Sequence, residues 1–465
     1  MIRWGVGLRL VAREFRGEEE AMYAATPPLE MMRVMLSLAA SRRGHKVPYQ
    51  LGVLDVSRAF FQAECHVDTF VALPPELRDQ HPGMCWKLRK AMYGTRPAAQ
   101  AWQKEYSKRM ESWGFERNRS NPCCLYSKSR DLRVFVHGDD FLTLGSRSYV
   151  VWFHDKMKAQ YEVKVKSVLG EGAEDDKEAR ILNRRVSWGA EGISYEADEK
   201  HAKQIIEDLG LKGASPVTTP IIRKGAGQEE NTEELTKEEA KRFRGIAARI
   251  NYIALDRADL QYAAKEVCRK MSKPVMADWD TLKRIGRYLL HRPRAKLMYK
   301  CQRRWAGMKV YTDANHAGCL KTKKSSSSGH IMLGQHCVKS WSSTQAVIAL
   351  SSGESEYYSL VKGASEALGL RNAMRDWNLE VEVDLATDSS AALGIASRLG
   401  LNKRTRHIDL VFLWLQQWVD RGELKIREIA GNKNPADSGT KPLDQYALDK
   451  CMSKIGLVYL GEGEA

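Results

Sequence analysis

The sequence predicts a multidomain chain that combines α+β and α/β domains, and three observations carry this prediction. The chain has 465 residues, which suits about two to four domains. Short β-prone runs mix with amphipathic helices up to about residue 215, a helical and basic stretch follows, and strands resume from about residue 308. Apolar residues make up 43% of the chain, an ordinary content for globular domains.

The first part of the chain is predicted to mix buried strands with amphipathic helices. Residues 51–56 form an apolar run typical of a buried strand. Residues 132–144 are expected to form two strands, separated by the turn-like residues 137–140. Apolar residues recur at helical spacing in 30–40 and 98–113.

A polar segment separates these elements from the helical part of the chain. Residues 223–234 contain almost no large apolar residue and are the best candidate for a linker. Thr236 and Glu239 then have the spacing of a capping box, which predicts a helix to about residue 254. Two further helices are expected at 260–271 and 278–291.

From about residue 308 the pattern predicts a compact α/β layer domain. The expected order is three strands, a long helix, a strand, a helix and a last strand. Their expected bounds, in chain order, are 308–312, 329–333, 338–342, 353–376, 381–387, 407–419 and 424–429.

The charge of the chain indicates a polyanionic partner. The net charge is +16, of which residues 1–303 carry +14 and residues 304–465 carry +2. Nucleic acid is favoured over an anionic membrane, although charge alone leaves open a merely soluble basic protein. Since the chain has neither a run of 18 apolar residues nor a signal-peptide core, we expect no membrane span and an intracellular location, in the cytoplasm or nucleus. Its nine cysteines predict reduced thiols.

Acidic residues lie at the ends of expected strands in the N-terminal half. Asp55 comes near the end of one strand, and Asp139 and Asp140 lie in the turn between two others. Three carboxylates converge if these strands are neighbours, and carboxylate oxygens suit a pair of Mg²⁺ ions. An ordinary acidic hairpin turn is the alternative. The residues alone leave open whether this is an ordinary turn or a two-metal site for phosphodiester chemistry.

A second group of acids predicts a second metal site in the C-terminal third. Its members lie at ends of expected strands or helices: Asp313, Glu356, Asp388 and Asp437. Glu354 lies in the same helical turn as Glu356, and we assign it a favourable interaction with the helix dipole. His407 is either a proton carrier beside the metal or simply a residue at a helix start.

Several blocks of sequence, in order, resemble the reverse transcriptase–RNase H region of Pol from copia-type LTR retrotransposons. Examples are Leu-Asp-Val-Ser-Arg-Ala-Phe-Phe at 54–61 and Ala-Asp-Ser-Gly-Thr-Lys-Pro-Leu at 436–443. The resemblance extends over about residues 9–443. The other matching blocks are 9–15, 87–102, 114–117, 124–126, 137–140, 247–269, 279–291, 325–329, 341–343, 354–357 and 405–409.

This resemblance implies a right-hand polymerase fold followed by a nuclease. It implies reverse transcriptase fingers and palm over 1–222, a helical thumb or connection over 235–303, an RNase H-like domain over 304–445 and a tail over 446–465. The implied activities are RNA- and DNA-templated DNA synthesis and cleavage of RNA in RNA–DNA hybrids. The implied partners are an RNA template, a DNA primer, an RNA–DNA hybrid and dNTPs. The implied cofactor is Mg²⁺, two ions per active site, with Mn²⁺ as the alternative.

The resemblance also implies roles for single residues. The polymerase metal ligands correspond to Asp55, Asp139 and Asp140, and those of the RNase H to Asp313, Glu356, Asp388 and Asp437. Phe60 resembles the aromatic residue that selects deoxynucleotides by blocking a ribose 2′-hydroxyl. His407 lies in the family's His-Ile-Asp motif, and Arg9 and Arg13 are candidates for neutralising the triphosphate.

Three residues depart from the family's pattern in the polymerase half. His137 and Gly138 replace an aromatic and an apolar residue before the Asp pair, and Pro97 replaces a Gln that lies near the incoming nucleotide. We expect Gly138 to loosen the turn. Two alternatives therefore stand beside the active enzyme: a catalytically weakened nucleic-acid-binding remnant, and an active RNase H with a vestigial polymerase.

Overall fold

A computed structural model describes residues 11–12, 24–223, 231–305, 307–319 and 321–461. Arg9 and Arg13 therefore lie outside the described residues. The chain divides into two compact units, and the division falls within helix α1 (Leu29–Ser41) and after Asp176. The first unit contains Met1–Met32, Lys46–Asp176 and Asp376–Asn378; the second contains Arg33–His45, Lys177–Arg375 and Leu379–Ala465.

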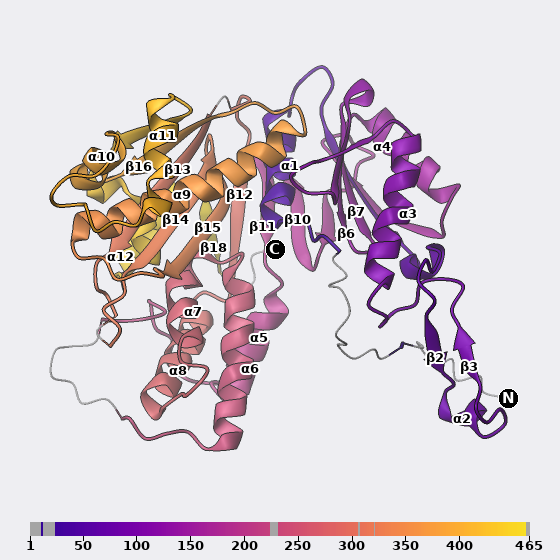
Figure 1. The fold of residues 1–465 in the computed structure, drawn as a ribbon, viewed down its shortest axis with the longest axis horizontal. Coiled ribbons are helices and arrows are strands. Elements are labelled where there is room, and N and C mark those ends of the chain that lie inside the picture. Colours follow the sequence, from indigo (N-terminus) through magenta and orange to yellow (C-terminus); the bar gives the residue numbers. More distant parts are fainter. Residues whose placement is uncertain (1–10, 13–23, 224–230, 306, 320, 462–465) are drawn as a thin grey trace. The chain divides into compact units, whose positions relative to one another are not determined.

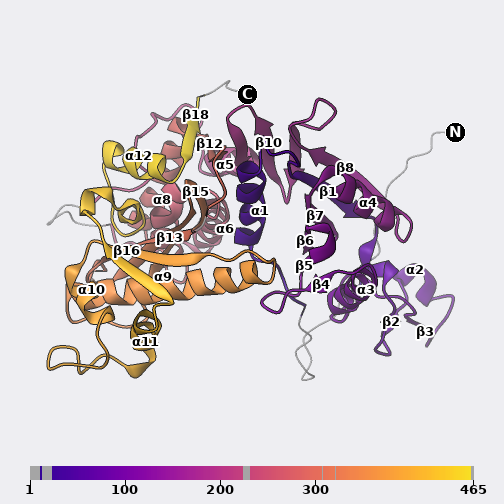
Figure 2. The same cartoon turned by 90° about the horizontal axis from the view of Figure 1, so that it is seen from above.

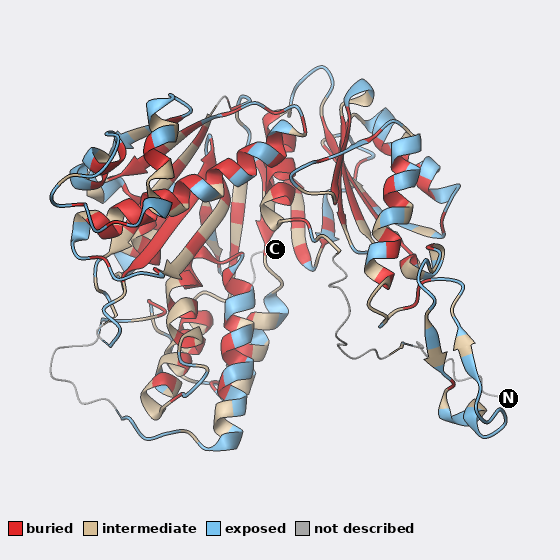
Figure 3. Ribbon diagram, in the orientation of Figure 1, coloured by how far each residue is buried: buried red, intermediate tan, exposed pale blue. Residues whose placement is uncertain are grey.

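The first unit is built on a six-stranded antiparallel sheet (Figure 1). Its strands, in spatial order, are β4 (Glu116–Arg117), β5 (Cys124–Ser127), β6 (Leu132–His137), β7 (Asp140–Gly145), β1 (Gln50–Val56) and β8 (Val163–Leu169). The central strands β6, β7 and β1 are buried over nearly their whole length (Figure 3). The strands expected at 51–56 and 132–144 are thus confirmed.

Two helices pack against this sheet (Figure 2), namely α3 (Ala98–Ser112) and α4 (Arg147–Lys158). Trp102 and Tyr106 of α3 are one helical turn apart, and both contact Phe141 of β7 edge-to-face. The unit also contains the 3₁₀ helix η1 (Ala59–Gln62) and a small hairpin. The hairpin elements are β2 (Phe70–Ala72), α2 (Pro75–Arg78) and β3 (Cys85–Lys87).

The first sheet of the second unit joins segments that were expected to belong to different domains. Its antiparallel strands, in spatial order, are β18 (Leu457–Leu460), β12 (Arg294–Lys300), β11 (Gly192–Glu196), β10 (Arg184–Gly189) and β9 (Glu178–Ile181). Strands β9–β11 were expected to belong with the fingers and palm. Residues 446–465 were expected to be a tail, but α12 (Gln445–Lys454) and β18 occupy most of them. Leu457 and Leu460 are buried, which explains why this end of the chain folds.

Four helices form the helical part of the second unit (Figure 1). They are α5 (Glu199–Asp208), α6 (Lys237–Ala254), α7 (Gln261–Cys268) and α8 (Met276–His291). The capping box is confirmed, because the Thr236 hydroxyl accepts a hydrogen bond from the Glu239 N–H (3.3 Å) and the Glu239 carboxylate accepts one from the Thr236 N–H (3.0 Å). The helices expected at 260–271 and 278–291 are present as α7 and α8.

The second sheet of this unit is mixed, and it contains the five strands expected for the α/β layer domain. In spatial order its strands are β15 (His336–Thr344), β14 (Ser326–Leu333), β13 (Gly307–Asn315), β16 (Glu382–Thr387) and β17 (Leu424–Glu428). β13, β16 and β17 run parallel, whereas β14 and β15 are antiparallel neighbours. The long helix α9 (Ser352–Arg375) packs on β13, β14 and β16 (Figures 1 and 2).

Two elements beside this sheet differ from the expectation. Helix α10 (Ser390–Ala396) was not expected. The helix expected at 407–419 is wrong at its beginning, where the 3₁₀ helix η4 (Leu410–Phe412) is capped by Asp409 and precedes the short α11 (Trp414–Asp420). Leu410 and Val411 are exposed, so this segment lacks the buried apolar face that would sustain a longer helix.

Two expectations from composition can be compared with the described residues. None of the described helices combines the length and the apolar composition that crossing a bilayer requires. All nine cysteines are described, and all are free thiols.

Candidate active sites: two carboxylate clusters

The first cluster lies where β1 meets the β6–β7 hairpin. Asp55 stands directly opposite Asp140 in the antiparallel pair of β1 and β7, and Asp139 precedes Asp140 in the hairpin turn. One carboxylate oxygen from each of the three residues lies within 4.8 Å of the others. The Val56 N–H donates to the Asp139 carbonyl (2.9 Å), which ties the turn to the end of β1. The structure therefore brings together the three carboxylates predicted for this site.

The hairpin turn depends on Gly138. His137 pairs with Asp140, so Gly138 and Asp139 form a two-residue loop, and the φ of Gly138 is 65°. Positive φ at the first position of such a loop favours glycine and suits the twist of the flanking strands. The Trp102 indole N–H also donates to the Gly138 carbonyl (2.9 Å). The expectation that Gly138 loosens the turn is therefore not borne out by the turn geometry.

Lys166 is the basic partner of this cluster and was not predicted from the sequence. Its Nζ lies 2.6 Å from Asp140 Oδ1 and 3.4 Å from Asp55 Oδ1. Burial lowers the pKa of Lys166, but the hydrogen bond to Asp140 and the charges of Asp140 and Asp55 raise it by more, so the pKa is raised overall. Burial raises the pKa of Asp139, and repulsion from Asp55 and Asp140 adds to that effect.

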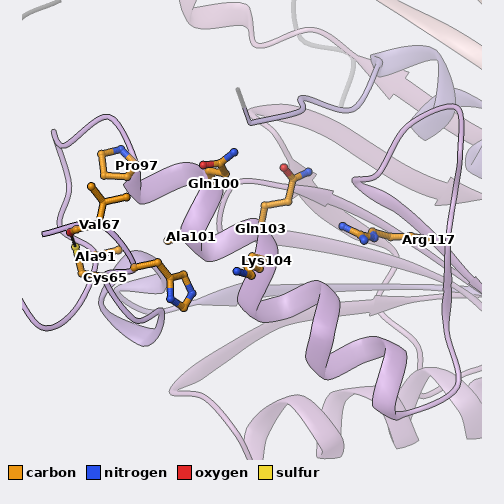
Figure 4. A pocket seen from close by; sticks show the side chains of 10 residues that line it. Cys65, Val67, Ala91, Pro97, Gln100, Ala101, Gln103, Lys104 and Arg117 are labelled. Carbon is orange, nitrogen blue, oxygen red and sulfur yellow. Dashed lines mark hydrogen bonds between the residues drawn. The ribbon is translucent and has the colours of Figure 1, made fainter. Parts of the chain in front are cut away.

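The residues expected near the nucleotide lie on elements that flank this cluster. Phe60 lies on η1, which follows β1, and its ring packs on Tyr93 at a centroid distance of 4.5 Å. Pro97 precedes the first residue of α3 and lines a cavity of about 390 Å³, together with Cys65, Gln100 and Lys104 (Figure 4). Among the described residues, the lining of this cavity includes none of the seven carboxylates.

The second cluster lies where the parallel strands β13 and β16 end beside the start of α9. Asp313 lies on β13, Asp388 directly follows β16, and Glu356 is in the first turns of α9. One oxygen from each of these carboxylates lies within 4.8 Å of the others. The carboxyl ends of neighbouring parallel strands share one edge of the sheet, which explains how distant residues meet there.

The electrostatics of this cluster fit a cation. Asp313 is only 4% exposed. Burial raises the pKa of Asp313 and the pKa of Glu356, and repulsion from neighbouring carboxylates raises both further. Glu356 Oε1 accepts a hydrogen bond from the Ala314 N–H (3.1 Å), whereas its buried Oε2 has no hydrogen-bond partner within the described part of the chain. A divalent ion bound here would give this buried oxygen a partner and would offset the repulsion among the carboxylates.

Asp437 borders this cluster and is held by a buried polar network. It lies on the 3₁₀ helix η6 (Pro435–Gly439). Burial raises the pKa of Asp388 and of Asp313, and the charge of Asp437 raises both further. The Thr440 hydroxyl donates to Asp313 Oδ2, and the Ser342 hydroxyl donates to the Gly439 carbonyl (2.5 Å). A Cβ on Gly439 would lie 2.2 Å from the Ser328 hydroxyl oxygen, so the small residues at both positions allow η6 to pack on β14.

Lys441 is the basic partner of this second cluster. Its Nζ lies 2.7 Å from Asp437 Oδ1. Burial lowers the pKa of Lys441, but the hydrogen bond to Asp437 and the surrounding carboxylate charges raise it more. Sequence spacing could have indicated this pair, because Lys441 follows Asp437 by four residues.

Glu354 and His407 contact each other beside the cluster. Glu354 is buried, accepts hydrogen bonds from the Leu350 N–H (2.9 Å) and the Tyr358 hydroxyl (2.7 Å), and lies 2.8 Å from the Nε2 of His407. These contacts do not test the assignment of Glu354 to an interaction with the helix dipole, which stays a prediction. The His407 ring thus lies against Glu354, and its catalytic role stays a prediction.

Each of the two carboxylate clusters lies at the ends of rigid strands, an arrangement suited to the class of nucleic-acid enzymes that use divalent metal ions. Comparison with known proteins agrees with this class. Residues 7–223 match the family model described as reverse transcriptase (RNA-dependent DNA polymerase).

Two curated relatives match almost the whole chain. The Retrovirus-related Pol polyprotein from transposon TNT 1-94 of Nicotiana tabacum is 25% identical over 479 residues, covering 97% of this chain and 34% of the relative. The one from transposon RE1 of Arabidopsis thaliana is 27% identical over 464 residues, covering 97% and 30%. A solved structure of the foamy viral protease-reverse transcriptase in complex with RNA/DNA hybrid is 11% identical, with a TM-score of 0.49, covering 88% of this chain and 46% of that chain.

Nearly the whole chain is thus similar to copia-type retrotransposon Pol polyproteins, and its residues 7–223 match the reverse transcriptase family model. It spans about a third of the length of the two curated relatives. The resemblance drawn from the motifs and the expected multidomain mixture of helices and sheets are both confirmed.

Proposed function

We propose that this chain copies RNA and DNA templates into DNA at the first cluster and cleaves the RNA strand of RNA–DNA hybrids at the second. One observation carries the proposal: Asp55 meets Asp139 and Asp140 within reach of a single ion, inside a reverse transcriptase domain. The net charge of +16 supports a nucleic-acid partner, and we propose a template–primer duplex and dNTPs as the substrates.

The proposed polymerase reaction joins the primer 3′-oxygen to the α-phosphorus of a dNTP and releases pyrophosphate. Bound divalent ions, Mg²⁺ or Mn²⁺, would lower the pKa of the attacking hydroxyl and neutralise charge on the phosphate oxygens. Asp55, Asp139 and Asp140 are proposed as the residues that hold them. The chain supports this role with rigidity, because Asp55 and Asp140 are paired across two buried strands.

Phe60 is proposed to exclude ribonucleotides. Its ring is packed against Tyr93 and is partly buried beside the core of the first unit, so it holds a fixed position close in sequence to Asp55. A ring held in place by close packing cannot move aside for the 2′-hydroxyl of a ribonucleotide.

The proposed nuclease reaction adds a water oxygen to a phosphorus of the RNA strand and breaks one P–O bond of the backbone. The residues proposed to hold the divalent ions are Asp313, Glu356, Asp388 and Asp437. Burial of Asp313 and the unsatisfied Glu356 Oε2 support this role, because charges act strongly in a site with little water.

Primer extension on an RNA template with Mg²⁺, run beside cleavage of a labelled RNA–DNA hybrid, tests both activities. Asp139→Asn should abolish extension and leave cleavage, whereas Asp313→Asn should abolish cleavage and leave extension. Extension that Asp139→Asn leaves unchanged would refute the first site, and cleavage that survives Asp313→Asn would refute the second.

An active RNase H with a vestigial polymerase is the second candidate function. The observation that favours it is the replacement of the family's residues by His137 and Pro97 beside the polymerase site, while the second cluster keeps all four acids. Hybrid cleavage without detectable extension would identify this alternative.

A further inference from the structure

Lys166 reaches the polymerase carboxylates because of an irregularity in β8. In the pairing of β8 with β1, Val165 stands opposite Leu54 and Ser167 stands opposite Val53, so Lys166 is the extra residue of a β-bulge. A bulge turns the extra residue away from the regular alternation of the strand. Here the Lys166 ammonium contacts both Asp140 and Asp55, at 2.6 and 3.4 Å.

The second cluster has the same arrangement on an unrelated element. Lys441 follows η6 and contacts Asp437 at 2.7 Å, on the border of the carboxylates of Asp313 and Asp388. Each cluster in this chain therefore combines several carboxylates with one lysine. Neither lysine is deeply enclosed, since the side chains of Lys166 and Lys441 are 40% and 44% exposed.

Lysine is suited to a cationic contact that forms and breaks. Its ammonium is a compact charge on a flexible four-carbon stem, so it can leave a carboxylate without a change in the backbone. The half-buried carboxylates of Asp55, Asp139 and Asp140 repel one another, and an ammonium between two of them reduces that repulsion. A carboxylate oxygen that pairs with the ammonium is not free to bind a divalent ion at the same time, so the two cations compete.

We propose that Lys166 is a tethered counter-ion of the polymerase site, which neutralises Asp55 and Asp140 in the metal-free protein and exchanges with the divalent ion. The inference rests on the proposed function, in which these carboxylates are the metal ligands. Lys166 is a positioning residue in this account. It keeps the carboxylates together before the ion arrives, and it weakens ion binding by competition.

Direct ion binding tests the proposal. Mn²⁺ binding is measured by electron paramagnetic resonance on the full chain, in a background of Glu356→Gln and Asp388→Asn that silences the second cluster. Lys166→Met should bind Mn²⁺ roughly 3- to 10-fold more tightly than the background chain, since two ion pairs no longer compete. In EDTA the same variant should have a lower melting temperature than the background chain. Added Mg²⁺ should raise its melting temperature by more than it raises that of the background chain.

Three further variants make the measurement decisive. Lys166→Arg retains the charge and should restore the background affinity, and Lys158→Met removes an exposed lysine of α4 and should leave it unchanged. If Lys166→Met does not fold, as judged by circular dichroism, Lys166→Gln replaces it in the same comparison.

Two outcomes separate this inference from the proposed function. Mn²⁺ affinity that is equal or weaker in a folded Lys166→Met chain, together with loss of binding in Asp140→Asn, overturns the counter-ion and leaves the metal site standing. Mn²⁺ binding that Asp140→Asn does not change overturns the metal site, and with it the inference.

Discussion

At the scale of single residues, the backbone of the β6–β7 turn decides how the polymerase carboxylates meet. Gly138 has a positive φ, and no atom lies within 4 Å of the position that a Cβ would occupy. A larger residue here would therefore strain the backbone but would not clash with its neighbours. This strain would fall on the residue directly before Asp139. Glycine at this position therefore favours the observed geometry of the cluster.

Gly138→Ala should lower the free energy of unfolding by about 1–2 kcal/mol, the cost of left-handed backbone for an L-residue. Urea denaturation of the full chain, followed by tryptophan fluorescence, measures the change. Gly245→Ala is the matched control, because Gly245 lies in α6 with an open position and no positive φ, so alanine should stabilise there. An unfolding midpoint that Gly138→Ala leaves unchanged would contradict the strain.

The buried acids of the second cluster predict a pH dependence. Burial and repulsion raise the pKa of Asp313 and of Glu356 in the folded chain. The folded protein then keeps protons that the unfolded chain releases above about pH 4, so stability is full below that pH and is lost as pH rises. In EDTA we expect the melting temperature to fall between about pH 5 and 8, and Glu356→Gln should flatten this slope. An equal slope in both chains would show that Glu356 does not hold the proton.

At the scale of elements, local sequence patterns predicted the strands and helices that carry the acidic residues. The apolar run before Asp55, the interrupted run around Asp139 and the capping box at Thr236 each act through neighbours in sequence, so their elements appear as expected. Lys166 could not be found in this way, because its contact needs a bulge in the pairing of two distant strands. The pairing of β18 with β12 is equally remote in sequence, which is why residues 446–465 looked like a tail.

Because β18 pairs with β12, the side chains on the buried face of β18 should contribute to the free energy of unfolding. Leu457 is 3% exposed, whereas its neighbour Val458 is 40% exposed, as expected for alternating faces of a strand. Leu457→Ala should lower the free energy of unfolding by about 2–4 kcal/mol, and Val458→Ala by less than about 0.5 kcal/mol. Chemical denaturation of the full chain measures both. Equal small losses would show that β18 is not part of the core.

At the scale of the whole chain, most of the net positive charge lies in the first 303 residues. Residues 1–303 carry +14 of the net charge of +16. On α6, Lys237, Lys241 and Arg244 are all exposed, and their spacing of four and three residues places them on one face of the helix. A basic helical face of this kind is suited to contacts with phosphates rather than with base edges.

Affinity for a template–primer duplex should therefore depend steeply on salt. Each phosphate contact that a cationic side chain makes releases a counter-ion, so six to ten contacts would cost roughly 10³- to 10⁵-fold in affinity between about 50 and 200 mM salt. Replacing Lys237, Lys241 and Arg244 with Gln should reduce the slope of log K against log salt by about two to three, with little dependence on sequence. Fluorescence anisotropy with a labelled duplex measures the slope. Glu238→Gln on the same helix removes no cation and should leave the slope unchanged, so a triple variant that matches this control would place the phosphate contacts away from α6.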